Sequence, residues 1–400
     1  MLIENSQQSL LRGKPENGHH RVTFVELFFD LVFVFAVTQL SHSLLEHLSL
    51  LGALQTTLLL MAVWWVWIYT SWVTNWLDPD ATPVRLMLFV LMVAGLLLST
   101  SLPQAFGARG WAFAGAYVAM QLGRSLFTLW ALAGRNEVNF RNFQRISAWL
   151  GLSALFWFAG ACVAEQARLP LWALALLIEY ASPALGFWTP GLGRSTTADW
   201  DVEGGHLAER CGLFVIIALG ESIVVTGAKF ATLAWTTATV TAFVAALIGT
   251  IAMWWIYFNI GAERASARIM ASADPGRLAR LAYTYVHIVL VAGIIVCAVA
   301  DELILSHPWD ETETATRAVL IGGPALYLIG NILFKRATAS RMVLSHFVGL
   351  GLLGGLSLAA LPPLPLGAAS SLVMVLVATW ETLSLKGEGV SPAGAPTRPS

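Results

Sequence analysis

The chain has 400 residues, of which 57% are apolar and only 12% are charged, whereas soluble domains carry about 25% charged residues. So few charges cannot cover a surface that faces water, which excludes a soluble globular protein. The formal net charge of −1 also argues against a nucleic-acid partner, because the chain offers no clustered basic face to neutralise phosphates.

Residues 1–21 are polar and carry Arg12, Lys14 and Arg21, without the apolar stretch and small-residue cleavage site of a signal peptide. We therefore expect a cytoplasmic N-terminal segment. Apolar runs of about 20 residues, enough to span a bilayer, then recur along almost the whole chain. They predict an all-α, polytopic integral membrane protein with about twelve transmembrane helices, at 24–45, 52–76, 84–106, 111–133, 144–166, 169–189, 206–229, 235–260, 278–302, 315–336, 340–361 and 365–385.

The first predicted helix carries two acids, Glu26 and Asp30, spaced four residues apart and hence on one helix face. Two carboxylates that close together raise each other's proton affinity. Glu26 has a second interpretation, because a negative charge at a helix start suits the positive end of the helix dipole. Asp30 lies one turn deeper, which favours a buried pair or a functional role.

The fourth and sixth predicted helices carry Arg124 and Glu179 near their midpoints. An arginine in hydrocarbon needs a partner or a water-filled cavity. We expect a carboxylate partner for Arg124, with Glu179, Asp30 and Glu221 as the candidates. The sequence does not choose among them.

The seventh predicted helix holds Arg210 and Glu221 eleven positions apart, a rotation of about 1100° that falls within about 20° of three full turns. The two residues therefore share one stripe. Glu221 also lies about 18 Å along the helix axis from Glu209, which places it near the middle of the membrane. As an alternative, Glu221 is a neutral carboxylic acid that hydrogen-bonds a neighbouring helix.

The predicted interior has more acids than cations, since five acids face only Arg124 and Arg210. A surplus of buried carboxylate favours coupling to protons or to another cation. His287, in the ninth helix, is either a proton relay or a hydrogen-bonded structural residue. The five acids are Glu26, Asp30, Glu179, Glu209 and Glu221.

A metal site is the main competing chemistry. The pairs His206 with Glu209 and His42 with Glu46 are spaced as helical metal ligands can be, but such pairs also arise by chance near helix ends. The sequence contains no GxSxG or HExxH motif to support a hydrolase. We therefore expect no cofactor and no metal, and rank a transporter ahead of an intramembrane enzyme or metal-dependent protein that acts on a lipid-derived substrate.

The basic residues are distributed unevenly between the two sides of the predicted helices. Of the 23 Lys and Arg residues, Arg124 and Arg210 are assigned to the membrane interior, and 17 of the others fall on the side that holds the N-terminus. By the positive-inside rule that side is cytoplasmic. An even number of helices places the C-terminus there too. The four residues on the other side are Arg109, Arg168, Lys229 and Arg317.

The second half of the chain repeats features of the first in the same order, which predicts two parallel six-helix repeats, 22–190 and 206–386. A cytoplasmic loop, 191–205, joins them, and a disordered tail covers 387–400. Such a duplication places a cavity between the halves near the membrane midplane. The matching features are AVWWVW at 62–67 with AMWWIY at 252–257, VAG at 93–95 and 291–293, LGRSLF at 122–127 with IGNILF at 329–334, Glu26 with Glu209, and Glu179 with Glu381.

Two stretches, ELFFDLVFVFAVTQLSH at 26–42 and HLAERCGLFVIIALGESI at 206–223, resemble the signature segments of the bacterial low temperature requirement A (LtrA) family. The similarity extends over residues 20–386, and Trp254, Trp255, Tyr285 and His287 also match that family's pattern. The resemblance implies a bacterial inner-membrane multipass protein without an established biochemical activity. We expect membrane lipid and a small solute, with protons or a cation, as its partners.

Overall fold

The computed structural model describes residues 10–13, 20–196, 203–259, 269, 272, 274–339 and 344–386. Over these residues the secondary structure is helical, apart from isolated bridges between Leu11 and Leu77 and between Thr189 and Gly193. The predicted all-α membrane protein is confirmed at this level. The predicted tail, 387–400, lies outside the described residues.

The first half of the chain forms six long helices whose starts are set by capping residues. Thr23 and Glu26 form a capping box at the start of α2, Ser49 caps α3, and Asn136 caps α6, so that each satisfies backbone N–H groups that the helix leaves free. The helices are α2 (Phe24–Glu46), α3 (Leu50–Trp76), α4 (Thr82–Ser101) with the short 3-10 helix η1 (Leu102–Gln104), α5 (Gly110–Leu132), α6 (Glu137–Cys162) and α7 (Glu165–Ala181).

The second half begins with α8 and contains one irregular helix. That helix starts at Asp274, whose side chain caps α11, and passes through a π-helical segment, η3, before it continues as α12. The elements are α8 (Gly204–Thr232), α9 (Thr237–Phe258), α11 (Pro275–Ala279), η3 (Arg280–Val286), α12 (His287–Ser306), α13 (Thr314–Ala339), α14 (Leu344–Leu356) and α15 (Pro363–Lys386).

Within the described residues, nine helices are long and apolar enough to cross a membrane. The other three are α5, which carries Arg124 among its buried residues, α7 with 17 residues and α14 with 13. The nine are Phe24–Glu46, Leu50–Trp76, Thr82–Gln104, Glu137–Cys162, Gly204–Thr232, Thr237–Phe258, Gly276–Ser306, Thr314–Thr338 and Pro363–Ser384. A multipass membrane protein follows from these lengths.

Two helix boundaries differ from the sequence prediction for local reasons. Helix α6 begins at Glu137 rather than at 144, because Asn136 accepts a hydrogen bond from Asn139 N and extends the helix into polar sequence. Helix α7 ends at Ala181 rather than at 189, because a proline follows at position 183 and has no N–H group to continue the helical hydrogen bonds.

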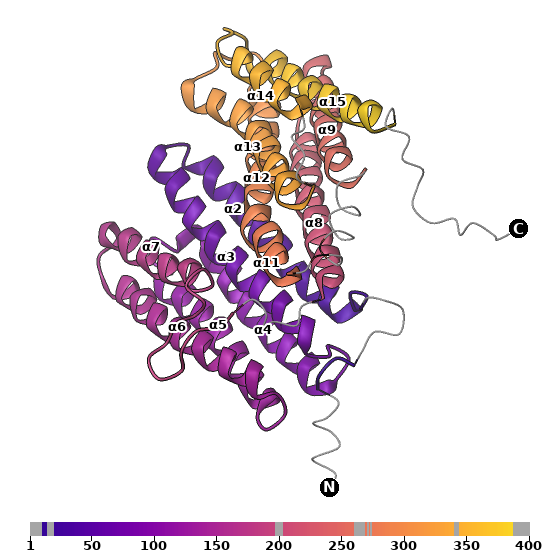
Figure 1. Ribbon diagram of the computed structural model, residues 1–400. Coiled ribbons are helices and arrows are strands. Elements are labelled where there is room, and N and C mark those ends of the chain that lie inside the picture. Colours follow the sequence, from indigo (N-terminus) through magenta and orange to yellow (C-terminus); the bar gives the residue numbers. More distant parts are fainter. Residues whose placement is uncertain are drawn as a thin grey trace, which may run out of the picture.

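The two halves meet along α2, α3, α8 and α12 (Figure 1). Helix α2 packs against α3 and α4 within the first half, and α8 packs against α9 and α12 within the second. Between the halves, α2 contacts both α8 and α12, and α3 contacts both as well. Two helices far apart in the sequence, α2 and α8, are therefore neighbours at the centre of the molecule.

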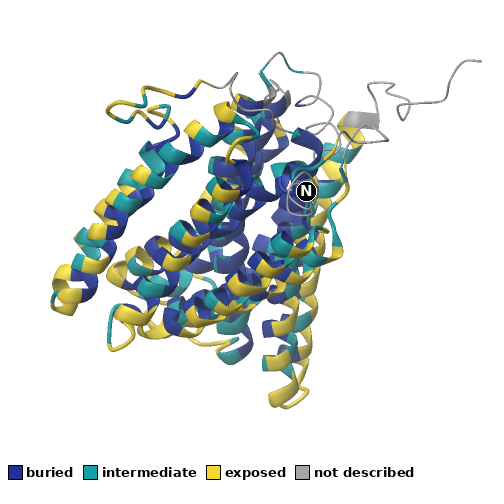
Figure 2. Cartoon of the chain, turned by 90° about the horizontal axis from the view of Figure 1, so that it is seen from below, coloured by how far each residue is buried: buried dark blue, intermediate teal, exposed yellow. Residues whose placement is uncertain are grey.

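The outer surface of the bundle is apolar. Figure 2 shows buried residues where the helices meet and exposed residues on their outer faces. Exposed positions include Leu86, Val90, Val93 and Leu97 on α4. A soluble monomer rarely exposes large contiguous apolar patches, so these apolar outer faces are suited to contact lipid.

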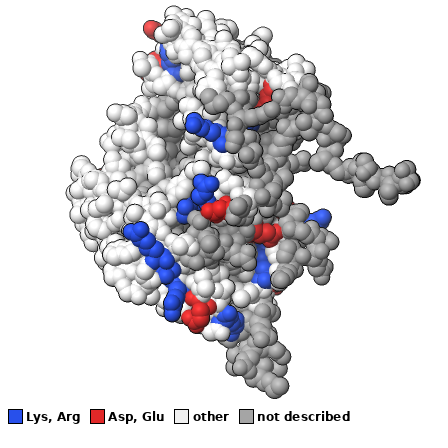
Figure 3. All heavy atoms as spheres, viewed as in Figure 1, with Lys and Arg blue, Asp and Glu red and all other residues white. Residues whose placement is uncertain are grey.

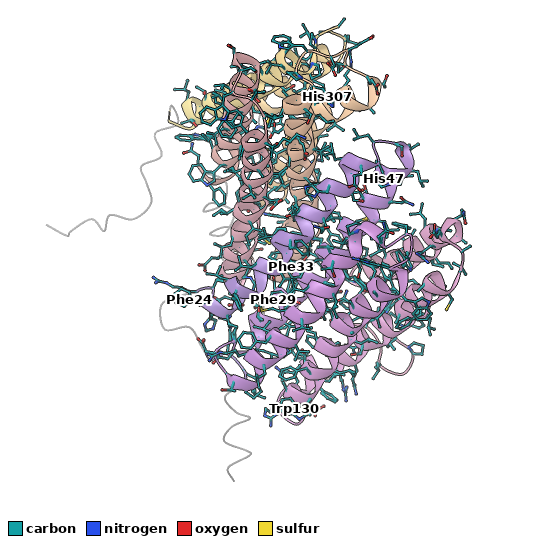
Figure 4. The ribbon with its side chains drawn as sticks, turned by 180° about the vertical axis from the view of Figure 1, so that it is seen from behind. Phe24, Phe29, Phe33, His47, Trp130 and His307 are labelled. Atoms are coloured by element: carbon teal, nitrogen blue, oxygen red, sulfur yellow. The ribbon has the colours of Figure 1, made fainter. Side chains whose placement is uncertain are left out.

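The charged side chains are unevenly placed on the surface. Figure 3 shows most of them through the middle and the lower part of the molecule, with a further group at the top, whereas the upper left flank is white. In Figure 4, Phe24 at the start of α2 lies on one side of the bundle, and His47 and His307 lie toward the other. The bundle therefore has two distinct ends, as a membrane-spanning protein requires.

Candidate functional site

The most concentrated group of buried charges lies where α2 and α8 meet. Phe29 and Phe33, which Figure 4 shows midway along α2, are buried with their neighbours against the surrounding helices. On the same helix, Glu26 and Asp30 are completely buried, and so is Arg210 of α8. Charges in such a position are costly unless they are paired.

Arg210 holds both acids of α2. Its two terminal nitrogens donate to Glu26 Oε1 at 2.9 Å and to Asp30 Oδ1 at 2.6 Å. The i,i+4 spacing of the acids places both carboxylates on one face of α2, within reach of a single guanidinium. Glu26 also accepts from Thr23 N at 2.9 Å, so both interpretations of Glu26 apply, as a helix cap and as a buried ion-pair partner.

His206, one turn before Arg210 on α8, completes the contact with Glu26. Its Nε2 lies 2.9 Å from Glu26 Oε1, and its Nδ1 lies 3.4 Å from the side-chain nitrogen of Asn75. Because an amide nitrogen only donates, Nδ1 accepts and Nε2 donates, which corresponds to a neutral imidazole. His206 therefore adds a hydrogen bond without adding charge.

Arg12, from the segment that precedes α2, contributes the second cation. Its NH2 lies 3.1 Å from Glu26 Oε2, and its Nε donates to the carbonyl of Thr74 at 2.7 Å. Backbone hydrogen bonds from Arg12 N to Trp76 O and from Asp78 N to Leu10 O fix this segment across the end of α3. The N-terminal segment thereby closes one end of the site.

We call Arg12, Glu26, Asp30, His206 and Arg210 the central ion-pair cluster. Two carboxylates face two guanidinium groups, so the cluster is neutral overall when every member has its usual charge. The sequence predicted a surplus of acid over the membrane interior as a whole, whereas the charges balance within this cluster. Arg12 makes the difference, because the sequence placed it in a loop.

Not every atom of the central ion-pair cluster is satisfied. Asp30 Oδ1 accepts from Trp67 Nε1 at 2.8 Å, and the Arg210 guanidinium lies 5.7 Å from the ring centre of Trp67. However, Asp30 Oδ2 and Arg210 Nε have no hydrogen-bond partner among the described residues. Unpaired buried polar atoms are costly, so these two atoms are the least satisfied points of the cluster.

Two acids predicted from α8 lie elsewhere. Glu209 is exposed and accepts a hydrogen bond from Val22 N at 3.2 Å, so it lies outside the central ion-pair cluster. Glu221 is buried, at 3% exposure, but its neighbours are Thr38 and His42 rather than Arg210. Its Oε1 has no hydrogen-bond partner within the described chain. Asp30 pairs with Arg210, and Glu221 stands apart from both.

Arg124 lacks the carboxylate partner expected from the sequence. Among the described residues it donates instead to the side chain of Gln121, to Val66 O at 3.1 Å and to Thr70 Oγ1 at 3.0 Å. Its guanidinium also lies 5.5 Å from the ring centre of Tyr69. Several neutral acceptors and one aromatic face therefore replace the single charged partner.

Glu179 accepts hydrogen bonds only from uncharged donors. Tyr117 and Gln121 donate to one oxygen at 2.5 and 3.1 Å, and Ser153 and Trp157 donate to the other at 2.6 and 2.9 Å. Four donors saturate both oxygens. Glu179 thus joins α5, α6 and α7 into a rigid three-helix unit.

His287 is also fully engaged. Its Nδ1 lies 2.8 Å from the carbonyl of Ala282, and its Nε2 lies 2.7 Å from the hydroxyl of Tyr257. Since the carbonyl only accepts, Nδ1 donates and Nε2 accepts. This arrangement matches the structural interpretation of His287 more closely than the proton relay.

Neither predicted metal pair is assembled into a larger site. Among the described residues, no group of three or more His, Cys, Asp or Glu side chains is placed to hold a metal ion. His206 is committed to Glu26, and His42, Glu46 and Glu209 are exposed.

A second buried ion pair, which was not predicted from the sequence, lies in the other half of the bundle. Lys335 Nζ contacts both carboxylate oxygens of Glu381, at 2.6 and 2.7 Å, and lies 3.2 Å from His346 Nε2. The positive-inside count placed Lys335 in a loop, but only 6% of the residue is exposed. Glu381 itself was noted only as the counterpart of Glu179.

The fold and the central ion-pair cluster define a polytopic α-helical membrane protein in which buried charges join two groups of helices. Within that class, the family model of the bacterial low temperature requirement A protein (LtrA) matches residues 21–379, and the chain belongs to that family. It is also 40% identical over 376 residues to the protein described as "Uncharacterized protein RA0937" from Rhizobium meliloti (strain 1021), covering 93% of this chain and 92% of the relative. No solved structure matches significantly.

Proposed function

We propose that this chain is a secondary transporter of a small solute, coupled to protons or to another cation, in the bacterial inner membrane. The observation that carries the proposal is the central ion-pair cluster, which joins α2 to α8 and retains one unpaired oxygen on Asp30. Buried ionisable groups in membrane proteins commonly mark ion and substrate pathways.

The proposed architecture is a pair of parallel six-helix repeats with both termini in the cytoplasm. The packing supports it, because α2 contacts α3 and α4 as α8 contacts α9 and α12, and the final helices, α7 and α15, contact α3 and α9 respectively. A reporter fused after residue 387 is expected to behave as cytoplasmic, and one inserted at 307–313 as external. The opposite behaviour at either position excludes this topology.

The cluster suggests how an ion drives the change between two states. Arg210 divides its hydrogen bonds between Glu26 and Asp30. When a proton or cation occupies the free oxygen of Asp30, the charge of Asp30 is neutralised and Arg210 is held by Glu26 alone. Since removing one partner of a buried pair costs about 3–5 kcal/mol, this step is large enough to shift a conformational equilibrium. Release of Arg12 from Glu26 then opens the end of the site.

The test is solute uptake by proteoliposomes that contain the purified chain, with an imposed proton or sodium gradient and separate panels of amino acids, organic acids, sugars and polyamines. We expect gradient-dependent uptake within one panel, and loss of that uptake in Asp30→Asn. Glu209→Gln is the matched control, because this acid lies on the surface and its loss leaves the cluster intact.

Growth complementation in a bacterium that lacks its own family member provides a second measurement. Glu221→Gln is expected to accumulate normally but to fail in complementation if Glu221 carries a proton. Full complementation by both Asp30→Asn and Glu221→Gln, together with no uptake in any panel, would falsify the coupling and leave these acids as structural contacts.

A further inference from the structure

A second polar site lies in the other half of the bundle, at a distance from the central ion-pair cluster. It is a small pocket between α9, α12, α13 and α15, with a volume of about 30 Å³ accessible to a water-sized molecule. Its polar lining comes from Asp301, Thr250, Ser370 and Ser371. None of these four residues was predicted from the sequence as a site residue.

Asp301 lacks a cationic partner. Its one hydrogen bond within the described chain comes from Ser222 Oγ on α8, at 3.5 Å from Oδ2, and it forms no ion pair with any described residue. The neighbouring acid, Glu302, lies 3.7 Å from Lys229. A carboxylate among packed helices needs a proton or a cation, and Asp301 lines the pocket with no cation of the described chain paired to it.

The hydroxyl groups around the pocket are available as ligands. Ser370 is 3% exposed, and its Oγ has no hydrogen-bond partner in the described residues. The Thr250 hydroxyl donates to Ala246 O at 3.2 Å, which leaves its lone pairs free. The lining contains no lysine, arginine or histidine, so no protein cation competes for the position.

The backbone of α13 supplies one more oxygen. Pro324 lies inside this helix and lacks the N–H group that would otherwise pair with the carbonyl of Leu320, four residues earlier. Both residues line the pocket. The helix stays continuous through Pro324, and a carbonyl that lacks its helical N–H partner keeps lone pairs free to bind a cation.

Charge decides which ion the pocket suits. The centre of a water-sized molecule can occupy about 30 Å³ of it, more than the roughly 10–15 Å³ that one bound water requires, so a small ion has room to bind. One carboxylate balances one positive charge, whereas a divalent cation would leave an uncompensated charge in a low-dielectric site. We propose that this pocket binds a sodium ion through Asp301, Ser370 and the carbonyl of Leu320.

The sodium site deepens the proposed function, on which it rests for its role in coupling, but binding itself is measurable without transport. Purified full-length protein in lipid nanodiscs is first washed into choline chloride. Sodium binding is then measured with radioactive sodium, and thermal unfolding is followed in sodium, potassium and choline chloride at equal ionic strength. We expect saturable binding of sodium, and stabilisation by sodium that exceeds stabilisation by potassium.

Three variants test the assignment. Asp301→Asn is expected to lose sodium binding, and Ser370→Ala to weaken it by roughly 2- to 10-fold, the equivalent of one hydrogen-bonding ligand. Glu302→Gln is the matched control, because this acid is adjacent in sequence and pairs with Lys229. Its sodium binding should equal that of the wild type. Ser370→Ala keeps the test decisive if Asp301→Asn does not fold.

The outcomes separate the two proposals. Absence of sodium binding to the wild type, or unchanged binding in both Asp301→Asn and Ser370→Ala, overturns the site. If sodium binds as expected but no solute is taken up in any panel, the site stands and the transport proposal fails. If solute uptake depends on Asp30 but not on sodium, the transport proposal stands and the sodium site fails.

Discussion

The two polar regions along α8 differ in how their charges are compensated. At the start of the helix, Arg210 meets Glu26 and Asp30, and Arg12 also pairs with Glu26. Further along the same helix, Glu221 has Thr38 and His42 as neighbours, and its Oε1 lacks a hydrogen bond among the described residues. Asp301 of α12 accepts only from Ser222 within the described chain. The first region is therefore held together by ion pairs, whereas the acids of the second lie outside any ion pair of the described residues.

This difference shows that burial alone does not determine the role of an acidic residue. Asp30 and Glu221 are both buried, yet only Asp30 lies in an ion pair. Removing the charge of Asp30 deprives Arg210 of a partner, whereas removing the charge of Glu221 leaves no cation exposed. Stability measurements on single variants can therefore distinguish the two regions.

Arg210→Ala is expected to have the largest effect. It leaves Glu26 with Arg12 as its one arginine partner among the described residues and Asp30 with only the Trp67 hydrogen bond. Breaking a buried pair in this way costs about 3–5 kcal/mol. Unfolding of the purified protein in mixed micelles, followed by tryptophan fluorescence, measures the loss. Arg85→Ala is the control, because its pair with Asp80 is exposed and such pairs contribute about 0–1 kcal/mol. Equal losses in both variants would contradict the assigned role of Arg210.

Asp30→Asn should have an intermediate effect. The amide oxygen still accepts from Trp67 and Arg210, but the charge that strengthens both hydrogen bonds is lost, and a hydrogen bond to a charged group contributes about 1.5–3 kcal/mol. The same unfolding assay applies. Combining Asp30→Asn with Arg210→Ala should cost less than the sum of the single losses, since the two residues share one interaction. Strict additivity would show that they are not coupled.

Glu221→Gln should have the smallest effect on stability, below about 1 kcal/mol, because it keeps the shape of the side chain and removes no ion pair. This expectation holds whatever its effect on transport. A loss as large as that of Arg210→Ala would show that Glu221 has a charged partner in the native state, and the contrast between the two regions would then disappear.

The sequence predicted the helices well because their signal is local. Apolar length is readable within a few positions, and so is a capping residue such as Thr23 before α2, but the cap at Asn136 was not identified, and α6 was predicted to begin at 144 rather than at 137. Asp30 was one of three candidate partners for Arg124 and pairs with Arg210 instead. The angle between residues on one helix indicates a shared face, but it does not identify the neighbouring helix.

The remaining site residues depended on contacts between distant segments. Arg12 and Lys335 were assigned to loops by their position near helix ends, although both reach carboxylates on other elements. Asp301 lies near the end of an apolar run and was not predicted as a site residue. Its candidacy as a ligand depends on the hydroxyl groups of α9 and α15 that line the same pocket. Charged residues near predicted helix ends therefore require the same attention as those at midpoints.

The separation between the partners of the central ion-pair cluster has a consequence during biosynthesis. Glu26 and Arg210 are 184 residues apart in the chain. At about 5–20 residues per second, the ribosome takes roughly 10–40 s to produce the arginine after the acid. Throughout that interval α2 carries two acids whose partner on α8 does not yet exist, and Arg12 is the only member of the cluster that can accompany them. The nascent helix must therefore wait in a polar environment, beside the insertion machinery or at the lipid headgroups, until α8 arrives.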